Sequence, residues 1–401
     1  MDFSFGIYKK DKKTLARAGK IITPHGEIET PAFSPVATRA SVRTLSPEDI
    51  KDTNSQVILG NTYHLYLRPG TEIIRKFQGF GPFMGWNGPT ITDSGGYQIS
   101  FLWDKGKNDI KIEKEDKIGR VIKITDKGMD FYSHIDGSKH LLTPEKSMEI
   151  QSVLGADIIM SLDQPMGYKF TEKQNNEAYE RTFDWEERSF LSWNKNGKRS
   201  HDGKFQALFG IIQGELDKRK RLRFLKFILS LGFPGIAIGD ETIGSDPKIT
   251  AKSLDIISGL IPDDKPLHAL GLGGGPEGIF EAVSRGVDLF DNSSVTRMAR
   301  TGLLFIYPED GGNMLNKFRV DIKKSKFKDM KKPFSKICSC YSCQNFSAAY
   351  LHHLTISEEV LGLRLATIHN VTFVNNLMEQ IRKSIKEGEF VSYKRCWLRR
   401  A

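Results

Sequence analysis

The sequence lacks a long apolar run. No uninterrupted apolar stretch approaches the ~20 residues that a membrane-spanning helix requires, and the opening segment, MDFSFGIYKKDKK, has no apolar core of a secretory signal peptide. We therefore expect a cytoplasmic protein with no membrane partner. Hydrophobic residues make up 39% of the chain and charged residues 27%, which is typical of soluble globular proteins. The 401 residues suffice for one large core and an appended module.

Cysteine is scarce: the chain has four, and three of them fall in the hexapeptide CSCYSC as Cys338, Cys340 and Cys343. This clustering does not suit a disulfide framework, and the spacing predicts a structural Zn²⁺ site instead. The alternative is three buried or redox-active thiols. A closed tetrahedral site needs a fourth ligand, and the residues alone leave that choice open. The downstream candidates are His352, His353 and His369.

Acidic residues are outnumbered by basic ones. The 49 Asp and Glu residues stand against 59 Lys and Arg residues, which gives a formal net charge of +10. Such an excess favours a polyanionic partner, most plausibly nucleic acid, whereas the alternative is a lysine-rich solvated surface. The cationic linker 321–336, DIKKSKFKDMKKPFSK, leads to the cysteines, and we expect it to contact an RNA or DNA backbone.

Short apolar runs that end in a polar residue or glycine alternate with helix-like segments through most of the chain. This rhythm predicts a parallel sheet whose two faces are both buried. The predicted fold class is α/β, a (β/α)₈ TIM barrel with a zinc-binding subdomain near the C-terminus; an open doubly wound sheet is the alternative. The runs are QVILGN with Asn61, PTITDSGG with Asp93, ADIIMSLD with Asp163, ALFGIIQG with Gln213, GIAIGDE with Gly239 and Asp240, PLHALGLGGG with Gly271, and VDLFDN with Asp291.

The segments outside these runs have their own patterns. Residues 18–43 alternate apolar pieces with turn residues and predict short paired strands that cap one end of the domain. Helix starts are predicted at Ser46 (with Glu48) and at Thr143, and two late helices at 345–354 and 367–387, the second opened by His369. Residues 104–128 are highly charged and predict an insertion or mobile loop, with a hairpin at VIKITDKGMDF.

Three acids end predicted strands: Asp93, Asp163 and Asp291. The carboxyl ends of parallel barrel strands meet at one face, so these side chains should converge. Two carboxyls suit a glycosidic displacement, with one as nucleophile and the other as acid/base. With the Gln213 amide they also suit the edge of a purine-like ring, and Tyr97 suits its face. The alternative is that each acid is structural.

Glycines and arginines flank the last of these acids. The GLGGGPEG segment at 271–278 lies too late in the chain for a dinucleotide fingerprint and fits a loop whose backbone amides approach phosphate. Arg297 and Arg300 follow Asp291 closely and suit an anionic substrate.

Five motifs together resemble the tRNA-guanine transglycosylases of the bacterial type, also called queuine tRNA-ribosyltransferases. They are GNTYHLYLRPG (60–70), TDSGGYQI (92–99), LFGIIQGE (208–215), FDNSSVTR (290–297) and CSCYSC with His369. The motifs occur in order, and the resemblance runs from about residue 5 to residue 387.

The resemblance implies an enzyme that exchanges guanine at the first anticodon position of certain tRNAs for a 7-deazaguanine, either queuine or its aminomethyl precursor. The nucleotide would be flipped out of the anticodon loop. Asp291 would be the nucleophile that forms a covalent ribosyl–Asp intermediate, and Asp93 the proton acceptor that also grips the base. A homodimer is implied as well, since one anticodon stem-loop is large beside one barrel mouth.

The resemblance also assigns binding residues. The substrate base would be bound by Asp93, Ser94, Gly95, Gly96, Tyr97, Asp163, Gln213, Gly239 and Asp240. The tRNA would be contacted by Gly271, Leu272, Gly273, Gly274, Gly275, Pro276, Glu277, Thr296, Arg297, Met298, Ala299 and Arg300. One structural Zn²⁺ per subunit would be held by Cys338, Cys340, Cys343 and His369.

The chain departs from the family pattern where specificity is set. It has Gly239-Asp240-Glu241 in place of Gly-Gly-Leu, Pro165 in place of a common Cys, and Ser294-Val295 in place of Leu-Pro. Two extra acids would favour a cationic substituent on the incoming base. The alternatives are a relative that modifies DNA or uses a different deazapurine, and an inactive RNA-binding paralogue. The inactive paralogue is disfavoured because the residues for catalysis and base binding are all present, namely Asp93, Asp163, Gln213 and Asp291.

We expect three parts. Residues 1–330 would form the catalytic barrel with its N-terminal strands, 331–387 the zinc-binding subdomain with the last barrel helix, and 388–401 a basic tail that lies outside the resemblance and is disordered or contacts RNA.

Overall fold

The computed structural model describes residues 2–102, 121–168, 170–244, 246–272 and 275–399. Most of the predicted insertion therefore lies outside the described residues. Among the helices of the described ranges, none combines the length and the apolar character that crossing a membrane requires.

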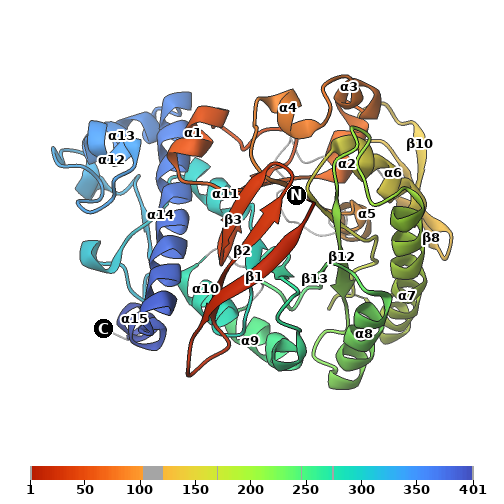
Figure 1. The fold of residues 1–401 in the computed structure, drawn as a ribbon. Helices are drawn as coiled ribbons and strands as arrows, with labels where there is room; N and C mark the ends of the chain where they lie inside the picture. The colour runs from red at the N-terminus through yellow and green to blue at the C-terminus, as the bar shows by residue number, and fades with distance from the viewer. Residues whose placement is uncertain (1, 103–120, 169, 245, 273–274, 400–401) are drawn as a thin grey trace.

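A parallel sheet closes into a barrel at the centre of the fold (Figure 1). Strand β4 pairs with β15 and β5 pairs with β6, and only Pro35 separates β4 from β5, so one interrupted strand joins both ends of the sheet. The (β/α)₈ barrel is confirmed and the open doubly wound sheet is excluded. The strands are β4 (Ala32–Ser34), β5 (Val36–Ala37), β6 (Ile58–Gly60), β7 (Thr90–Thr92), β11 (Ile158–Met160), β12 (Ala207–Ile212), β13 (Gly235–Ile238), β14 (Leu267–Ala269) and β15 (Leu289–Asp291).

The seven predicted runs each contain one barrel strand, but the first barrel strand of the chain is not among them. It lies at 32–37, inside the segment that was predicted as cap only. Pro31 and Pro35 flank and interrupt this strand, and proline ordinarily marks a turn or a strand edge. The barrel tolerates Pro35 because the chain changes its pairing partner there, from β15 to β6.

A three-stranded antiparallel sheet, β1 (Ser4–Lys10), β2 (Arg17–Thr23) and β3 (Gly26–Thr30), covers the N-terminal end of the barrel. The Arg17 guanidinium lies 2.6 Å from the Asp288 carboxylate, and His25 Nδ1 lies 2.7 Å from Asp157 Oδ1. Asp288 and Asp157 directly precede β15 and β11, so these bonds tie the cap to the strand beginnings. The capping strands are confirmed, and the opposite end of the barrel is left for a site.

Helices surround the barrel. They are α1 (Pro47–Asp52), α2 (Thr62–Leu67), α3 (Thr71–Lys76), α4 (Phe80–Met84), α5 (Gly96–Leu102), α6 (Pro144–Leu154), α7 (Glu172–Lys195), α8 (Lys218–Leu231), α9 (Pro247–Asp255), α10 (Pro276–Val283) and α11 (Ser294–Arg300). The N-caps Ser46 and Thr143 are confirmed, although the capping box of α1 is completed by Asp49.

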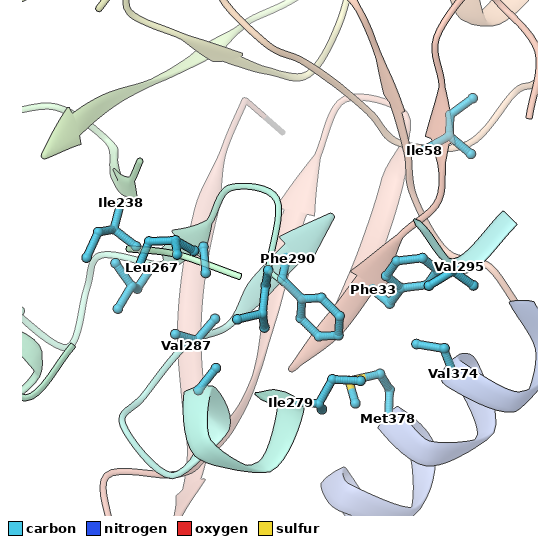
Figure 2. Packing of buried hydrophobic residues seen from close by; sticks show 14 of the residues in the cluster. Phe33, Ile58, Ile238, Leu267, Ile279, Val287, Phe290, Val295, Val374 and Met378 are labelled. Atoms are coloured by element: carbon cyan, nitrogen blue, oxygen red, sulfur yellow. The ribbon is translucent and has the colours of Figure 1, made fainter. Parts of the chain in front are cut away.

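The outer faces of the strands pack on these helices in a continuous core. Phe33 of β4 and Phe290 of β15 lie side by side with ring centroids 5.5 Å apart. Figure 2 shows Ile279 of α10 and Val374 and Met378 of α14 (Val360–Glu387) packed against them. This packing fixes the strand that carries Asp291.

Shorter elements interrupt the barrel. The hairpin predicted at VIKITDKGMDF is confirmed as β8 (Val121–Thr125) and β9 (Gly128–Tyr132), extended by β10 (Lys139–Leu142). Later come β16 (Leu303–Phe305) and β17 (Arg319–Asp321), which pair antiparallel, and the 3₁₀ turns η2 (Ser258–Leu260), η3 (Pro308–Asp310) and η4 (Ser325–Phe327).

The C-terminal region consists of α12 (Tyr341–Asn345), α13 (Ala348–Ile356), α14 (Val360–Glu387) and α15 (Phe390–Leu398). In Figure 1, α12 and α13 lie against α14 on the side of the barrel opposite α7 and α8. The predicted start of the second late helix and the predicted disorder of the tail are both wrong, whereas contact of the tail with RNA stays a prediction. Helix α14 begins at Val360 and not at 367, so His369 lies well inside it. Residues 390–398 form a packed helix in which Phe390 and Trp397 are buried. The division at residues 330 and 387 stays a prediction.

Candidate active site and metal centre

Three carboxyl groups meet at the open end of the barrel. Asp93 directly follows β7, Asp163 lies three residues beyond β11, and Asp291 ends β15. Burial raises the pKa of Asp93, and the negative charge of Asp291, which ends a strand at the same end of the barrel, adds to the rise. The convergence that the sequence predicted is therefore confirmed for this pair.

Asp93 is held by several donors. Its Oδ1 accepts hydrogen bonds from the backbone N–H of Thr62 at 2.9 Å and of Gly95 at 3.2 Å, and its Oδ2 accepts one from Asn61 Nδ2 at 2.5 Å. Burial raises the pKa of Asp93 to about 7; the Thr62 N–H opposes this rise and the charge of Asp291 adds to it. A carboxyl with this pKa can take up and release a proton near neutral pH.

Asp163 is paired with Gln213. Gln213 Nε2 donates to Asp163 Oδ2 at 2.6 Å, and Gln213 Oε1 accepts from the backbone N–H of Met166 at 3.3 Å. Burial raises the pKa of Asp163 to about 7, against the lowering effect of the Gln213 bond and of Ser94 Oγ, which donates to Oδ1 at 3.4 Å. The carboxyl and amide thus present fixed polar groups with defined orientation.

The turn after Asp93 brings Tyr97 to the mouth. Gly95 has φ +85°, and a Cβ on Gly96 would lie 2.4 Å from the carbonyl oxygen of Asp163, so this turn requires two glycines. Tyr97 is the second residue of α5 and is 49% exposed. Burial raises its pKa, Glu241 adds to the rise and Arg297 opposes it. The Tyr97 side chain therefore lies close enough to Glu241 and Arg297 for both charges to affect its pKa.

Asp291 accepts two hydrogen bonds on one oxygen. His268 Nε2 lies 3.0 Å from Oδ1, and the backbone N–H of Gly271 donates to the same atom at 3.2 Å. The Asp291 side chain is 13% exposed and that of His268 is fully buried. Asp291, the predicted nucleophile, is therefore partly accessible from the mouth, and the His268 side chain that contacts it is buried.

The sequence suggested that both Asp240 and Glu241 contribute negative charge at the mouth, but the Asp240 carboxylate does not face it. Its side chain is fully buried and lies 2.7 Å from Arg221 Nη2, which is also fully buried. Oδ2 accepts further from the Glu215 backbone N–H at 3.0 Å, and Oδ1 from the Thr242 N–H at 2.9 Å. The backbone of Asp240 has φ +139°, and these bonds hold it in that strained region. The neighbouring acid, Glu241, does not share this buried ion pair. Its Oε2 accepts a hydrogen bond from the Tyr168 backbone N–H at 2.8 Å.

The predicted RNA-binding residues divide into exposed and buried ones. Gly271 and Arg297 are exposed, Gly275, Glu277, Met298 and Arg300 are half-buried, and Leu272, Pro276, Thr296 and Ala299 are buried; Gly273 and Gly274 lie outside the described residues. A hollow of about 360 Å³ opens beside them, at the ends of β13, β14 and β15. Its lining includes Gly275, Glu277 and Ser294, together with Lys317 and Arg319.

The four predicted zinc ligands come together. The three cysteine sulfurs and a ring nitrogen of His369 lie within 4.8 Å of one another, and all four residues are buried. His369 Nδ1 lies 3.4 Å from Cys343 Sγ and 3.7 Å from Cys340 Sγ, while Nε2 is bonded to the Phe305 carbonyl oxygen at 2.8 Å. That second bond orients the ring so that Nδ1 faces the sulfurs. A buried set of three sulfurs and one nitrogen suits one structural Zn²⁺.

The other two histidines are excluded as ligands by their positions. His352 Nδ1 is bonded to the Ile322 carbonyl oxygen at 2.8 Å, and His353 is exposed on α13. Four protein ligands would leave no open position on a tetrahedral Zn²⁺, so the ion would cross-link α12 to α14 and stabilise the subdomain without taking part in chemistry.

Sequence reasoning missed several residues that the structure brings to the mouth. Asn61 and His268 lie in predicted strand runs without an assigned role, and Gln98, whose Nε2 lies 3.4 Å from Asp93 Oδ2, lies in a motif without one. Lys317 and Arg319 were not considered. Polar residues inside or just after an apolar run were the available signal for the first two, whereas the last two reach the site only through tertiary folding.

Comparisons with known proteins agree with the geometry. The family model described as queuine tRNA-ribosyltransferase matches residues 11–401, including the segment 388–401 that was expected to lie outside the resemblance. The queuine tRNA-ribosyltransferase of Desulforamulus reducens is 41% identical over 399 residues, covering 100% of this chain and 99% of its own. That of Aquifex aeolicus is 42% identical over 405 residues, covering 99% and 98% respectively.

Proposed function

Because this chain belongs to the queuine tRNA-ribosyltransferase family, we propose that it exchanges guanine at the first anticodon position of tRNA for a 7-deazaguanine. The observation that carries this proposal is the pairing of Asp93 and Asp291 at one barrel mouth. Asp93 has a pKa near 7, which suits a proton carrier, and Asp291 offers a carboxylate oxygen toward the mouth, which suits a nucleophile.

The exchange takes place in two displacements. Asp291 attacks C1′ of the ribose while the bond from C1′ to guanine N9 breaks, and the electron pair leaves with guanine, which takes a proton from Asp93. The incoming base then gives its N9 proton to Asp93 and attacks C1′, which displaces Asp291. Two inversions retain the β-configuration. One bond is exchanged for another of the same kind, so no energy cofactor enters.

The base is recognised by groups that already have fixed orientations. Asp163 accepts from the N–H donors of the guanine-like edge, and Gln213 and the Gly239 backbone bind its carbonyl edge. Ser94 holds Asp163, and the Gly95-Gly96 turn holds Tyr97 so that its ring stacks on the base. The positions of these side chains at the mouth and the polarity of the base support these roles.

The 7-substituent of the incoming base meets the changed strand end after β13. Since Arg221 neutralises Asp240, Asp240 shapes the backbone there and Glu241 supplies the negative charge. Queuine and its aminomethyl precursor both carry a cationic amine on that substituent, and the negative charge of Glu241 supports its role in binding this amine. This revises the expectation that both acids contribute charge.

The hollow beside β13–β15 binds the tRNA backbone next to the flipped nucleotide. The Gly275-capped start of α10 has no side-chain cap, which leaves backbone N–H groups for phosphate. Lys317 is exposed at the rim and Arg319 lines the wall. Arg297 is exposed on α11, six residues after Asp291, and adds a further cation for the tRNA backbone.

We assign a homodimer to an apolar patch on the zinc subdomain. The Tyr341 ring contacts the Phe346 ring, with centroids 5.7 Å apart, and the Phe346 ring stacks on that of Tyr350, with centroids 5.5 Å apart. In the same subdomain, Ile356 at the end of α13 and Val360 at the start of α14 are 56% and 71% exposed. An apolar surface of this kind does not suit an anionic RNA but suits a second copy of the same surface across a two-fold axis.

An exchange assay tests the proposal. The protein is incubated with radiolabelled guanine and either unmodified tRNA or duplex DNA, and we expect label in the tRNA alone. Label in the DNA alone would contradict the proposal in favour of the DNA-modifying alternative, and no label in either would favour the inactive paralogue.

The Asp291→Asn variant tests the nucleophile. It should form no denaturant-resistant adduct with tRNA, because an amide oxygen does not displace the base. The exposed Asp52→Asn variant is the matched control and should form the adduct as the wild type does. An adduct that survives in Asp291→Asn contradicts the assignment.

A further inference from the structure

His268 lies directly beneath Asp291 inside the barrel. Strands β14 and β15 pair in parallel with His268 opposite Leu289. Since side chains alternate along a strand, His268, Leu289 and Asp291 face the same side. Leu289 belongs to the interior apolar cluster, so that side is the barrel interior. His268 is fully buried there, one layer below the mouth.

The contact between the two residues distinguishes the carboxylate oxygens of Asp291. Oδ1 receives both His268 Nε2 at 3.0 Å and the Gly271 backbone N–H at 3.2 Å. In the described part of the chain no group donates to Oδ2. A carboxylate with one oxygen fixed by two donors has a defined rotamer and presents the other oxygen in one direction.

The second ring nitrogen of His268 indicates the tautomer. Nδ1 is buried and has no hydrogen-bond partner. An imidazolium would leave an unsatisfied N–H at that atom, and an Nδ1–H tautomer would in addition set a lone pair of Nε2 against the carboxylate. Only the neutral ring with its proton on Nε2 avoids both, because it leaves an unpaired acceptor and no unpaired donor.

We propose that His268 is a positioning residue which, as the neutral Nε2–H tautomer, holds Oδ1 of Asp291 so that Oδ2 is the oxygen that attacks the ribose. This inference rests on the proposed function. The bond from Oδ2 to C1′ forms as the bond from C1′ to guanine N9 breaks, and the proton for guanine comes from Asp93. His268 keeps its own proton throughout.

A neutral donor suits this role better than a cation. A cationic partner beneath Asp291 would hold the negative charge on Oδ1 and weaken the attack by Oδ2. The neutral imidazole fixes the geometry while leaving the charge to be shared with the carbon under attack. Correct placement of a reacting group is worth up to about 100-fold in rate for a displacement of about 1 Å.

Two substitutions separate positioning from packing. His268→Gln keeps an N–H donor at nearly the same reach and cannot carry a charge, whereas His268→Leu keeps an apolar filling and removes the donor. We expect His268→Leu to lower both kcat and the rate of adduct formation by about 10- to 100-fold, with the KM for tRNA nearly unchanged. His268→Gln should recover most of the rate.

The opposite order overturns the proposal. If His268 acts only by filling space, Leu will be tolerated and Gln will not, because an amide in an apolar layer lacks partners. If a positive charge is required, both variants will be equally slow. Wild-type exchange activity in the same assay separates this failure from failure of the proposed function: an inactive wild type contradicts the function, and an active wild type with an equally active His268→Leu contradicts only the inference.

A measurement on the unaltered protein covers variants that fold poorly. With ¹⁵N-labelled histidine, the His268 ring, identified by its absence in His268→Gln spectra or by its coupling to the β14 backbone, should show one protonated and one unprotonated nitrogen at neutral pH. Two protonated ring nitrogens would overturn the proposal.

Discussion

At the residue scale, the burial of Asp163 lowers the free energy of unfolding by an amount that depends on pH. Burial raises its pKa from 3.8 to about 7, so between about pH 4 and 7 the folded protein holds a proton that the unfolded chain releases. The free energy of unfolding must then fall as the pH rises through this window and level off above pH 7. This cost is the one expected for a buried carboxyl that serves the base recognition proposed above rather than the stability of the fold.

We expect Asp163→Asn to be more stable than the wild type at pH 8, on the order of 2 kcal/mol, because the amide replaces a buried charge. At pH 4 the two should be nearly equal, since the carboxyl is neutral in both states. Urea unfolding at each pH measures the difference. The exposed Asp329→Asn variant should show no pH-dependent gain; a similar gain there, or a gain for Asp163→Asn that is largest at pH 4, contradicts the prediction.

Residue identity also sets the limit of what the sequence revealed about the site. Asp93, Asp163 and Asp291 could be predicted because each ends an apolar run, and strand ends converge in a barrel. The orientation of Asp240 could not be predicted, because its partner Arg221 lies on α8, 19 residues earlier. His268 escaped notice because a single histidine inside an apolar run does not reveal which neighbour it contacts.

At the element scale, the strands were easier to predict than the late helices. A buried parallel strand is a short apolar run that its flanking turns delimit. By contrast, α14 begins at Val360 within a segment that carries no side-chain cap, so local signals did not mark its start. Helix α15 looks like a basic tail in sequence, yet Trp397 packs against Phe318 with ring centroids 5.4 Å apart. Its stability comes from tertiary contacts that composition does not show.

The short helices of the zinc subdomain carry the prediction about the dimer. Tyr350 on α13 stacks on Phe346 and is 39% exposed. If the patch is the interface, truncation of Tyr350 to Ala should weaken the dimer by about 2 kcal/mol, which is roughly a 30-fold rise in the dimer dissociation constant. Light scattering after gel filtration over a concentration series measures this shift.

Tyr132→Ala is the matched control, because Tyr132 is 43% exposed on β9 and belongs to another surface. It should leave the dimer unchanged. A wild-type protein that stays monomeric over the whole series, or a Tyr132 variant as weak as the Tyr350 variant, contradicts the assignment of the patch.

At the scale of the whole molecule, the net charge is +10, and the closed barrel determines which of the cations lie near the site. The cap occupies one end, so tRNA must approach the end where β13, β14 and β15 finish. Lys317 and Arg319 arrive there from the segment after the barrel, next to the glycine loop. The sequence predicted a basic protein that binds nucleic acid, but only the fold shows which of the many lysines border the site.

Lysines at the two ends of the barrel should therefore differ in their effect on tRNA binding. Replacing Lys317 with Gln removes one phosphate contact, so the slope of log K against log salt concentration should decrease by about 1, with weaker binding at low salt. Lys9 is exposed on β1 of the cap, and Lys9→Gln should leave the slope unchanged. Filter binding across a salt series distinguishes the two variants. Equal slopes would mean that the charge acts as a diffuse field, and the hollow beside β13–β15 would then lose its assigned role.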